Sequence, residues 1–211
     1  MTADSDVLTD HFWWRPGWRP GRAYLTWHVL PDPALAEALA PVRDALGGIE
    51  HLEVVRTARL HVTGPGLGFL DEIAPDVVAA LPEAARVRLD GVAPFAAALE
   101  DAAVGSNAVL IRLDAGRLAD VRHALRAAAR DVGLEPPGTD DEVYRPHLTL
   151  AYATGPARRR AIALALAQAQ LQSTRWPTLD VPAVTLLALR MEPPGYDWEK
   201  IARVDLGDVR E

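Results

Sequence analysis

Two histidines each stand two residues before a threonine, in stretches that otherwise have the apolar pattern of strands. The first is His61 in "RLHVTG", followed by Thr63, and the second is His147 in "RPHLTLAYA", followed by Thr149. Side chains alternate across a strand, so each histidine shares a face with its threonine, and the residue between them points into the opposite layer. Each stretch therefore presents an imidazole beside a hydroxyl on an apolar support.

Two such histidines facing each other suit the cleavage of a phosphodiester. Imidazole titrates near pH 6.5, so one ring can be neutral and accept a proton while the other is charged and donates one. The reaction needs a base for the attacking hydroxyl or water and an acid for the leaving oxygen, each worth about 10²–10⁴-fold in rate. The threonine hydroxyls can donate to non-bridging phosphate oxygens. This chemistry requires neither a metal nor another cofactor, and we predict none.

Arginines and tryptophans supply further candidates for substrate binding. Arg59 and Arg145 each stand two residues before a histidine, so on regular strands they would share its face and could reach a phosphate. The segment "HFWWRPGWRPGR" interleaves aromatics with arginines, which makes Trp14 and Trp18 candidates for base stacking. The competing interpretation is a hydrophobic strap over the core with its arginines reaching outward. The other histidines lack a threonine two residues on and are predicted to be structural or solvent-exposed; they are His11, His28, His51 and His123.

Composition limits the class of protein. The chain has 211 residues, 49% hydrophobic and 24% charged, as in an ordinary soluble globular protein of one domain or two small lobes. The absence of cysteine excludes disulfides, thiolate catalysis and cysteine-bound metals. A net charge of −7 argues against non-specific coating of DNA, although a local basic cleft remains compatible with it. The acidic N-terminus and the lack of a long apolar run predict a cytoplasmic protein without a membrane partner.

Periodicity and turn residues predict the elements that position the motifs. The predicted strands are 23–30, 52–64, 86–95, 107–114 and 144–153, and two more within 181–207 joined by a Pro-Gly turn. The predicted helices are 31–48, 70–81, 116–133 and 158–173, the last chosen over a strand for its alanine content and length. Asp32 caps the first helix and Pro41 kinks it. The strand with the first motif is expected to break into a glycine-rich loop after Thr63.

The order of elements predicts a duplication. A strand, a helix and a strand with His-x-Thr occur in the first half, and a helix, a strand with His-x-Thr and further strands occur in the second. This order favours an α+β protein of two lobes over the strict alternation of a doubly wound sheet. Residues 1–22 are predicted to be an irregular strap, and residues 23–211 a single bilobal catalytic domain with one motif in each lobe.

The paired motifs "HVTG" and "HLTL" resemble the H-x-T/S-x motifs of the two-histidine (2H) phosphoesterases. The nearer branch is named for RNA 2′,3′-cyclic phosphodiesterase and 2′-5′ RNA ligase activity, and the resemblance runs from "YLTWHVL" to "YDWEKIARVDLG". It implies a duplicated bilobal fold, with two antiparallel-rich sheets facing a central cleft and helices outside. It also implies metal-independent action on 2′,3′-cyclic phosphates or 2′-5′ bonds, with His61 as acid and His147 as base in hydrolysis. Gly64 departs from the family, which usually has an apolar residue there.

Three hypotheses follow. The first is a metal-independent 2H-type hydrolase, with RNA ligation as its reverse activity. It would be a monomer that acts on RNA ends or small nucleotides carrying a cyclic phosphate. The second is a non-catalytic nucleotide- or RNA-end-binding module with the same cleft, supported by the departure at Gly64. The third is a metal enzyme with the two histidines as ligands, for which Asp71 and Glu72 could add carboxylates.

Overall fold

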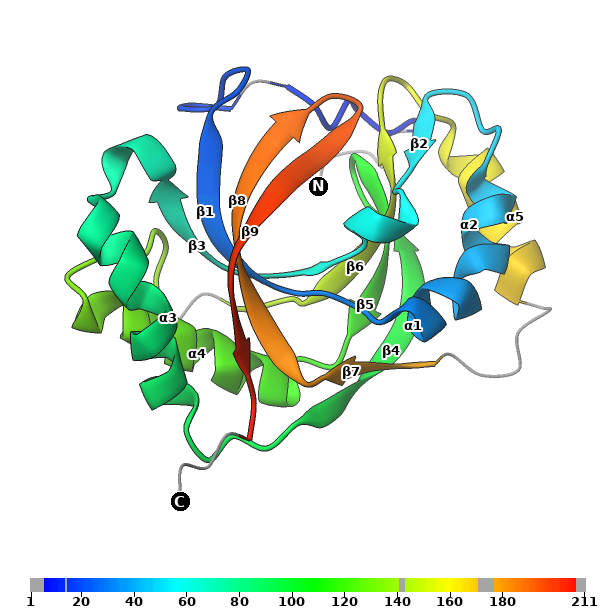
Figure 1. Cartoon of the computed structure of the whole chain (residues 1–211). Coiled ribbons are helices and arrows are strands. Elements are labelled where there is room, and N and C mark those ends of the chain that lie inside the picture. The colour runs from blue at the N-terminus through cyan, green and yellow to red at the C-terminus, as the bar shows by residue number, and fades with distance from the viewer. Residues whose placement is uncertain (1–5, 14, 141–142, 171–176, 208–211) are drawn as a thin grey trace.

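The computed structural model describes residues 6–13, 15–140, 143–170 and 177–207 (Figure 1). Its helices are α1 (Pro33–Ala38), α2 (Ala40–Leu46), α3 (Pro75–Leu89), α4 (Gly116–Asp131) and α5 (Arg159–Gln170), with 3₁₀ turns η1 (Thr57–Arg59) and η2 (Leu70–Glu72). Its strands are β1 (Ala23–Val29), β2 (Leu52–Val54), β3 (Val62–Phe69), β4 (Phe95–Val104), β5 (Ala108–Leu113), β6 (His147–Ala153), β7 (Thr178–Val181), β8 (Ala183–Glu192) and β9 (Gly195–Asp205). Among the described residues, no helix is long and apolar enough to cross a membrane.

The strands form one curled antiparallel sheet. Its order is β7-β4-β5-β6-β3-β1-β8-β9, with β2 paired to β6. The two wings meet where β3 lies against β6, and in the described part of the chain a single residue pair, Val62 with Leu148, joins those strands. The predicted α+β class and antiparallel pairing are confirmed. The two predicted sheets are the two wings of this sheet, and each wing carries one His-x-Thr motif.

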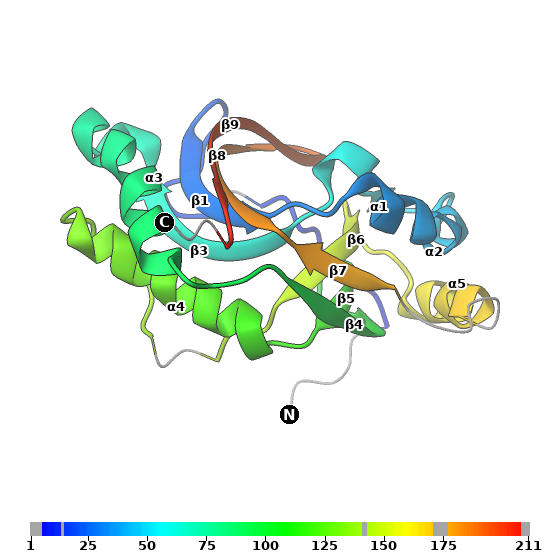
Figure 2. The same ribbon diagram turned by 60° about the horizontal axis from the view of Figure 1, so that its bottom comes forward.

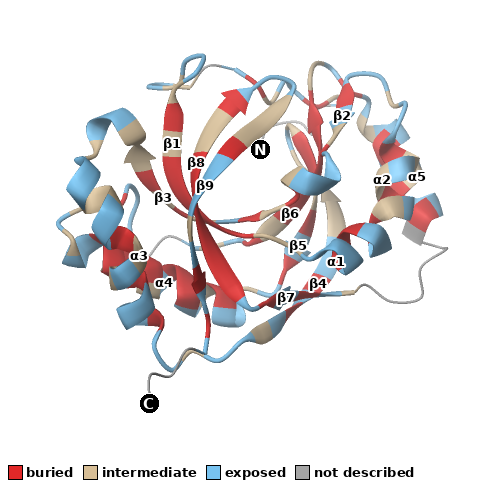
Figure 3. Ribbon diagram, viewed as in Figure 1, coloured by how far each residue is buried: buried red, intermediate tan, exposed pale blue. Residues whose placement is uncertain are grey.

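Helices cover the outside of both wings. Helices α3 and α4 pack together beside β1 and β3, and α2 packs with α5 at the far end (Figures 1 and 2). Buried residues concentrate on the strands and on the helix faces turned toward them (Figure 3). The central strand pair shows this clearly, because Val62 and Leu148 are both fully buried. The motif strands are therefore anchored in the core from the face opposite to their histidines and threonines.

The chain around the first motif differs from the prediction. The predicted strand 52–64 consists of β2, the turn η1 and the start of β3, and β3 continues to Phe69 instead of breaking after Thr63. A bulge near Gly64 shifts the pairing of β3 with β1, from Thr26 with Gly66 to His28 with Thr63. A side chain at Gly64 would place its Cβ 2.8 Å from the carbonyl oxygen of Trp27. Glycine is thus required because two backbones approach closely within a continuous strand pair.

Two other predicted elements need correction. The helix predicted for 31–48 is divided at Leu39 into α1 and α2, although Asp32 does cap α1 by accepting a 2.7 Å hydrogen bond from the Leu35 N–H. The strand predicted for 86–95 is wrong except at its last residue, because α3 extends to Leu89 and β4 begins only at Phe95. In α3 every fourth residue is buried, at Leu81, Ala85 and Leu89, so helical packing overrides the local alternation.

The helix predicted for 70–81 is shifted along the chain, because Leu70–Glu72 form the turn η2 and α3 runs from Pro75 to Leu89. The other predicted elements agree within a few residues. The strands at 23–30, 107–114 and 144–153 and the helix at 116–133 correspond to β1, β5, β6 and α4. The helix predicted for 158–173 is α5, and its last three predicted residues lie outside the described chain. The terminal hairpin is formed by β8 and β9. Before β1, Val7 makes an isolated bridge to Arg158, and Phe12 is buried against the core.

Candidate active site

The single bridge between β3 and β6 places the two motifs in a two-fold register. With Val62 opposite Leu148 in an antiparallel pair, His61 falls opposite Thr149 and Thr63 falls opposite His147. Residues opposite each other share a face, so all four side chains lie on one side of the sheet. The two histidines are then diagonal neighbours, which on a regular ladder lie roughly 7–8 Å apart. That spacing leaves room for one phosphate group, hydrogen-bonded on both sides.

Both histidines are held by the same contact. Nδ1 of His61 lies 2.9 Å from the carbonyl oxygen of Arg59, and Nδ1 of His147 lies 3.0 Å from the carbonyl oxygen of Arg145. A carbonyl can only accept, so each Nδ1 carries the hydrogen and donates it. Each neutral ring therefore keeps its lone pair on Nε2, which can take a proton or, once protonated, give one.

The surroundings of His61 are aromatic. The ring of His28, from β1, lies flat against it, with centroids 4.5 Å apart and planes 4° from parallel. Trp198, from β9, meets both rings edge-on, at 5.3 Å from His61 and 5.9 Å from His28. This burial, with a smaller contribution from His147, lowers the pKa of His61 to about 4. His61 is therefore neutral at pH 7 in the free protein.

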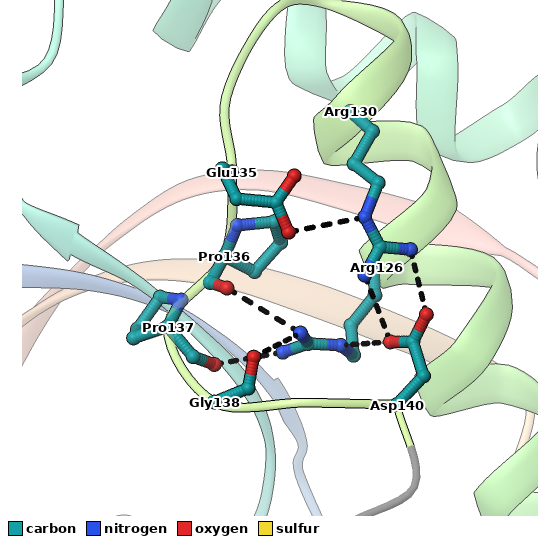
Figure 4. Close-up of polar contacts among 7 residues, drawn as sticks. All are labelled: Arg126, Arg130, Glu135, Pro136, Pro137, Gly138 and Asp140. Carbon is teal, nitrogen blue, oxygen red and sulfur yellow. Dashed lines mark hydrogen bonds and ion pairs between the residues drawn. The ribbon is translucent and has the colours of Figure 1, made fainter.

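His147 is supported by a different device. Within the described residues no aromatic ring stacks on it, and residues 135–140, between α4 and β6, are instead held by arginines of α4 (Figure 4). Arg126 is 1% exposed and donates to the carbonyls of Pro137 at 2.8 Å, Gly138 at 2.9 Å and Pro136 at 3.3 Å, and to the Asp140 carboxylate at 2.5 Å. Arg130 adds bonds to Glu135 and Asp140. The two guanidinium groups hold the pKa of Asp140 well below its usual range.

A side-chain hydrogen bond joins the two halves of the site in addition to the backbone pairing of Val62 with Leu148. The hydroxyl of Tyr144, three residues before His147, donates to the carbonyl oxygen of Thr63 at 2.7 Å. Burial raises the pKa of Tyr144 to about 12, so this donor keeps its hydrogen at physiological pH. The guanidinium of Arg122 lies 5.4 Å from the centre of the Tyr144 ring.

A bulge in β6 brings a tyrosine to the same face. Pairing with β5 shifts between Leu110, opposite Thr149, and Val109, opposite Ala151, so Leu150 is the extra residue. Tyr152 thereby joins the face of His147 and Thr149, and Thr149, which is 7% exposed, hydrogen-bonds its side chain. The alternation of an ideal strand would have turned Tyr152 away, which is why sequence reasoning missed it.

A hollow of about 330 Å³ opens beside His61. The stretch of chain from β2 to η1 forms one wall of this hollow, and the turn between β8 and β9 forms the other. Its lining residues include His61, Arg56, Arg59, Tyr152 and Tyr196. Tyr196 hydrogen-bonds His11 at 2.9 Å and belongs to an aromatic cluster with Phe12 and Tyr152. The hollow thus combines aromatic surface and a histidine with two arginines and two carboxylates, Glu53 and Glu192.

The two predicted arginines lie in different environments. The guanidinium of Arg59 pairs with Asp197 and lies 4.8 Å from the Trp198 ring centre, and η1 replaces the regular strand assumed for it. The side chain of Arg145 is exposed. Sequence reasoning missed Arg112, which pairs with His147 across β5 and β6 and is exposed on the same face. Among the described residues its guanidinium has no hydrogen-bond or ion-pair partner.

The other candidates from the sequence that the structure describes have partners of their own, and Trp18 also meets Tyr196 at the wall of the hollow, with ring centroids 6.5 Å apart. Trp18 is partly buried and stacks on Tyr24 at 5.4 Å, within a cluster that includes Phe69, and Trp14 lies outside the described residues. The carboxylates proposed for a metal site, Asp71 and Glu72, pair with Arg22. No group of three or more histidines and carboxylates that could hold a metal occurs in the described part of the chain.

Comparison with known proteins agrees with this geometry. A family model described as the 2′-5′ RNA ligase superfamily matches residues 31–190, more than half of the chain. No curated protein matches the chain.

Solved structures share its fold. LigT of E. coli in complex with 3′-AMP aligns with a TM-score of 0.65 and 19% identity, over 89% of this chain and 99% of LigT. The protein TT0787 of Thermus thermophilus aligns with a TM-score of 0.63 and 19% identity, over 87% and 97%. The PDE domain of MHV ns2 aligns with a TM-score of 0.50 and 10% identity, over 86% and 99%. At these identities the likeness establishes the fold.

Proposed function

The chain belongs to the 2′-5′ RNA ligase superfamily of two-histidine phosphoesterases, and on that premise we propose that it is a metal-independent cyclic phosphodiesterase. Its substrates would be 2′,3′-cyclic phosphates or 2′-5′ bonds of RNA ends or small nucleotides. The observation that carries the proposal is the two-fold register of His61, Thr63, His147 and Thr149 on one face. We also propose that the protein works as a cytoplasmic monomer.

In hydrolysis of a 2′,3′-cyclic phosphate, a water oxygen bonds to phosphorus while the bond from phosphorus to one ribose oxygen breaks. One histidine takes the proton of the water on its Nε2, and the other gives a proton from its Nε2 to the departing ribose oxygen. The hydroxyls of Thr63 and Thr149 donate to the non-bridging oxygens. With an RNA 5′-hydroxyl in place of water, the same groups would form a 2′-5′ bond.

We assign the acid to His61 and the base to His147. The hollow beside His61 is large enough for a nucleoside, with Tyr152 and Tyr196 as surfaces for its base, and a nucleoside bound there would bring its ribose oxygen close to His61. Although His61 is neutral in the free protein, a phosphate anion against Nε2 favours its charged form, so it would take up a proton with the substrate. An imidazolium of low pKa is a strong acid, which suits a poor leaving group.

Exposed cations on the other side of the site extend the proposal. Arg112 and Arg145 are exposed near His147, whereas Arg59 is already paired with Asp197. We propose that Arg112 and Arg145 contact phosphates of an RNA chain that leaves the site past His147. Trp18 lies 6.5 Å from Tyr196, which lines the hollow beside His61, so we keep it as a candidate for stacking a base on that side. Trp14 stays a candidate from the sequence alone.

The experiment is hydrolysis of an oligonucleotide ending in a 2′,3′-cyclic phosphate, in excess EDTA. Wild type, His61→Ala and His147→Ala are compared with His123→Ala, which alters an exposed histidine of α4, and all are checked for folding by circular dichroism. We expect turnover in wild type and His123→Ala and a loss of at least about 100-fold in each of the other two. Turnover that survives either active-site substitution would refute the assignment, and turnover that requires a divalent ion would revive the metal hypothesis.

The binding-module hypothesis loses the structural feature on which it depended. Gly64 was its support, because a break after Thr63 would loosen the first motif, and β3 is continuous there. A folded wild type that binds the cyclic phosphate end without cleaving it would restore this hypothesis.

A further inference from the structure

His28 is buried beneath His61 and has no place in the proposed chemistry. It comes from β1, where it pairs with Thr63 on one side and Thr185 on the other, and it is 1% exposed. Neither of its ring nitrogens has a hydrogen-bond partner among the described residues. Its parallel stack on His61 and the Trp198 edge across both rings enclose it.

A histidine in this position lowers the stability of the fold. A neutral imidazole carries one N–H donor and one acceptor, and burying such groups without partners costs free energy. Most buried polar side chains are paired, so an exception calls for a specific reason. The extensive contact of His28 is with the flat face of His61, and that contact indicates the reason.

We propose that His28 is a positioning residue: its buried ring is the floor against which His61 lies flat, fixing the direction of Nε2 and excluding water from one face of the His61 ring. The inference rests on the proposed catalytic role of His61 and adds a third histidine to the site. Together with the Arg59 carbonyl at Nδ1 and the Trp198 edge, the floor leaves the His61 ring little freedom to turn.

The charges around His28 fit this role. Across the stack lies His61, the residue before β3. A cavity of about 10 Å³ that His28 helps to line also has Arg122 of α4 and Tyr144 in its wall. The neighbours Thr185 of β8 and Trp198 of β9 carry no charge. None of these groups is a carboxylate that could support a charged imidazole, and burial and His61 lower the pKa of His28 well below its ordinary value. His28 therefore stays neutral and acts on His61 by excluding water.

The test is the titration of His61 followed by NMR of histidine-labelled protein, with its signals assigned from His61→Ala. In wild type we expect the pKa of His61 near 4. In His28→Ala water reaches the exposed face of the ring, so this pKa should rise by at least about one unit toward 6.5, and kcat should fall at least about tenfold. An unchanged titration of His61 in folded His28→Ala would overturn the proposal.

A second variant keeps the proposal testable if His28→Ala does not fold. His28→Phe retains a flat ring and removes the unpaired nitrogens, so the pKa of His61 should stay within about half a unit of wild type while the thermal midpoint rises by about 2–6 °C. A pKa of His61 near 6.5 in His28→Phe would show that the flat ring is not what matters. His123→Ala is the control and should change neither quantity.

The readout separates this inference from the proposed function. The NMR titration needs no substrate, so a wild type that is inert toward cyclic phosphates would refute the proposed function and leave the His28 result intact. Full activity in wild type with an unchanged His61 titration in His28→Ala would refute the role of His28 and leave the proposed function intact.

Discussion

His61 and His147 occupy equivalent positions in the two wings, yet the molecule supports them in different ways. Each is followed by a threonine and binds a backbone carbonyl through Nδ1. His61 is enclosed by rings from β1 and β9, whereas His147 follows a segment that two arginines of α4 fix in place. The four motif side chains thus share one symmetric arrangement, although the residues that hold each histidine in place differ between the two wings.

The two sides also differ in charge. Near His61 the guanidinium of Arg59 is neutralised by Asp197, and burial keeps the imidazole uncharged. Near His147 the exposed Arg112 has no described partner. A nucleoside suits the first environment, which is aromatic and nearly neutral, and a phosphate chain suits the second. The comparison can be tested from both sides.

The largest effect should be the same on both sides. His61→Gln and His147→Gln should each lower kcat by about 10²–10⁴-fold, because each removes one of two proton transfers. The double variant should be hardly slower than the worse single variant, since the two act as a unit. Single-turnover rates on the cyclic phosphate, with His51→Gln as control, measure this. Multiplicative losses in the double variant would show that the histidines act independently.

Arg126 should matter far more than its neighbour. Arg126→Met removes the donor to three carbonyls and one carboxylate from a buried site, so the free energy of unfolding should fall by about 2–4 kcal/mol. Arg130→Met, in a more exposed position, should lower the free energy of unfolding much less, because solvent screens its ion pairs. Denaturant unfolding gives both values. Equal losses would mean that the segment before His147 does not depend on the buried guanidinium.

The acid limb of the pH profile should report His61. A pair with both rings protonated has no base, so kcat/KM must fall as pH drops through the lower pKa of the pair, whichever histidine is the acid. That pKa is lowered to about 4, so activity should persist at pH 5, where a histidine of pKa 6.5 would have lost roughly 30-fold. Measuring kcat/KM from pH 3.5 to 8 tests this. An acid limb near pH 6.5 would contradict the buried environment of His61.

Arg112 should affect the binding of long RNA substrates more than the binding of a mononucleotide. Arg112→Gln should weaken binding of an RNA oligonucleotide about tenfold at low salt and reduce the salt slope by about one, with little effect on a cyclic mononucleotide. Arg203→Gln, whose guanidinium already pairs with Asp205, is the matched control. Binding isotherms at several salt concentrations give the slope. Equal losses for the mononucleotide and the oligonucleotide would place Arg112 at the reacting phosphate.

The sequence predicted the elements whose reasons are local. Alternation along one strand is enough to put a histidine and a threonine on one face, and it correctly located β5 and β6. It failed at 86–95, where packing of Leu81, Ala85 and Leu89 extends α3, and after Thr63, where Gly64 serves a close approach to Trp27. Both failures depend on a partner element that lies elsewhere in the chain.

The same limit applies to the site. The motif residues could be chosen from their spacing, whereas His28, Trp198 and Arg112 reach the site through strand pairing across long stretches of sequence. Tyr152 needed knowledge of a bulge at Leu150. A spacing rule within one stretch has no access to these contacts, so His28 was expected to be structural or exposed and Arg112 was not considered.

The smallest effect should come from the Tyr144 side chain, which adds a hydrogen bond between the two wings to the backbone pairing of Val62 with Leu148. Tyr144→Phe removes only the 2.7 Å hydrogen bond to the Thr63 carbonyl and keeps the ring, so unfolding should cost about 1 kcal/mol less free energy and kcat should fall a few-fold. The side chains of both motifs should be held less firmly in the variant, because Tyr144 precedes His147 while Thr63 follows His61. Thermal unfolding and kcat, with Tyr24→Phe as control, measure this. A loss of stability with unchanged kcat would mean that each wing positions its own histidine and that the bond between them serves the fold alone.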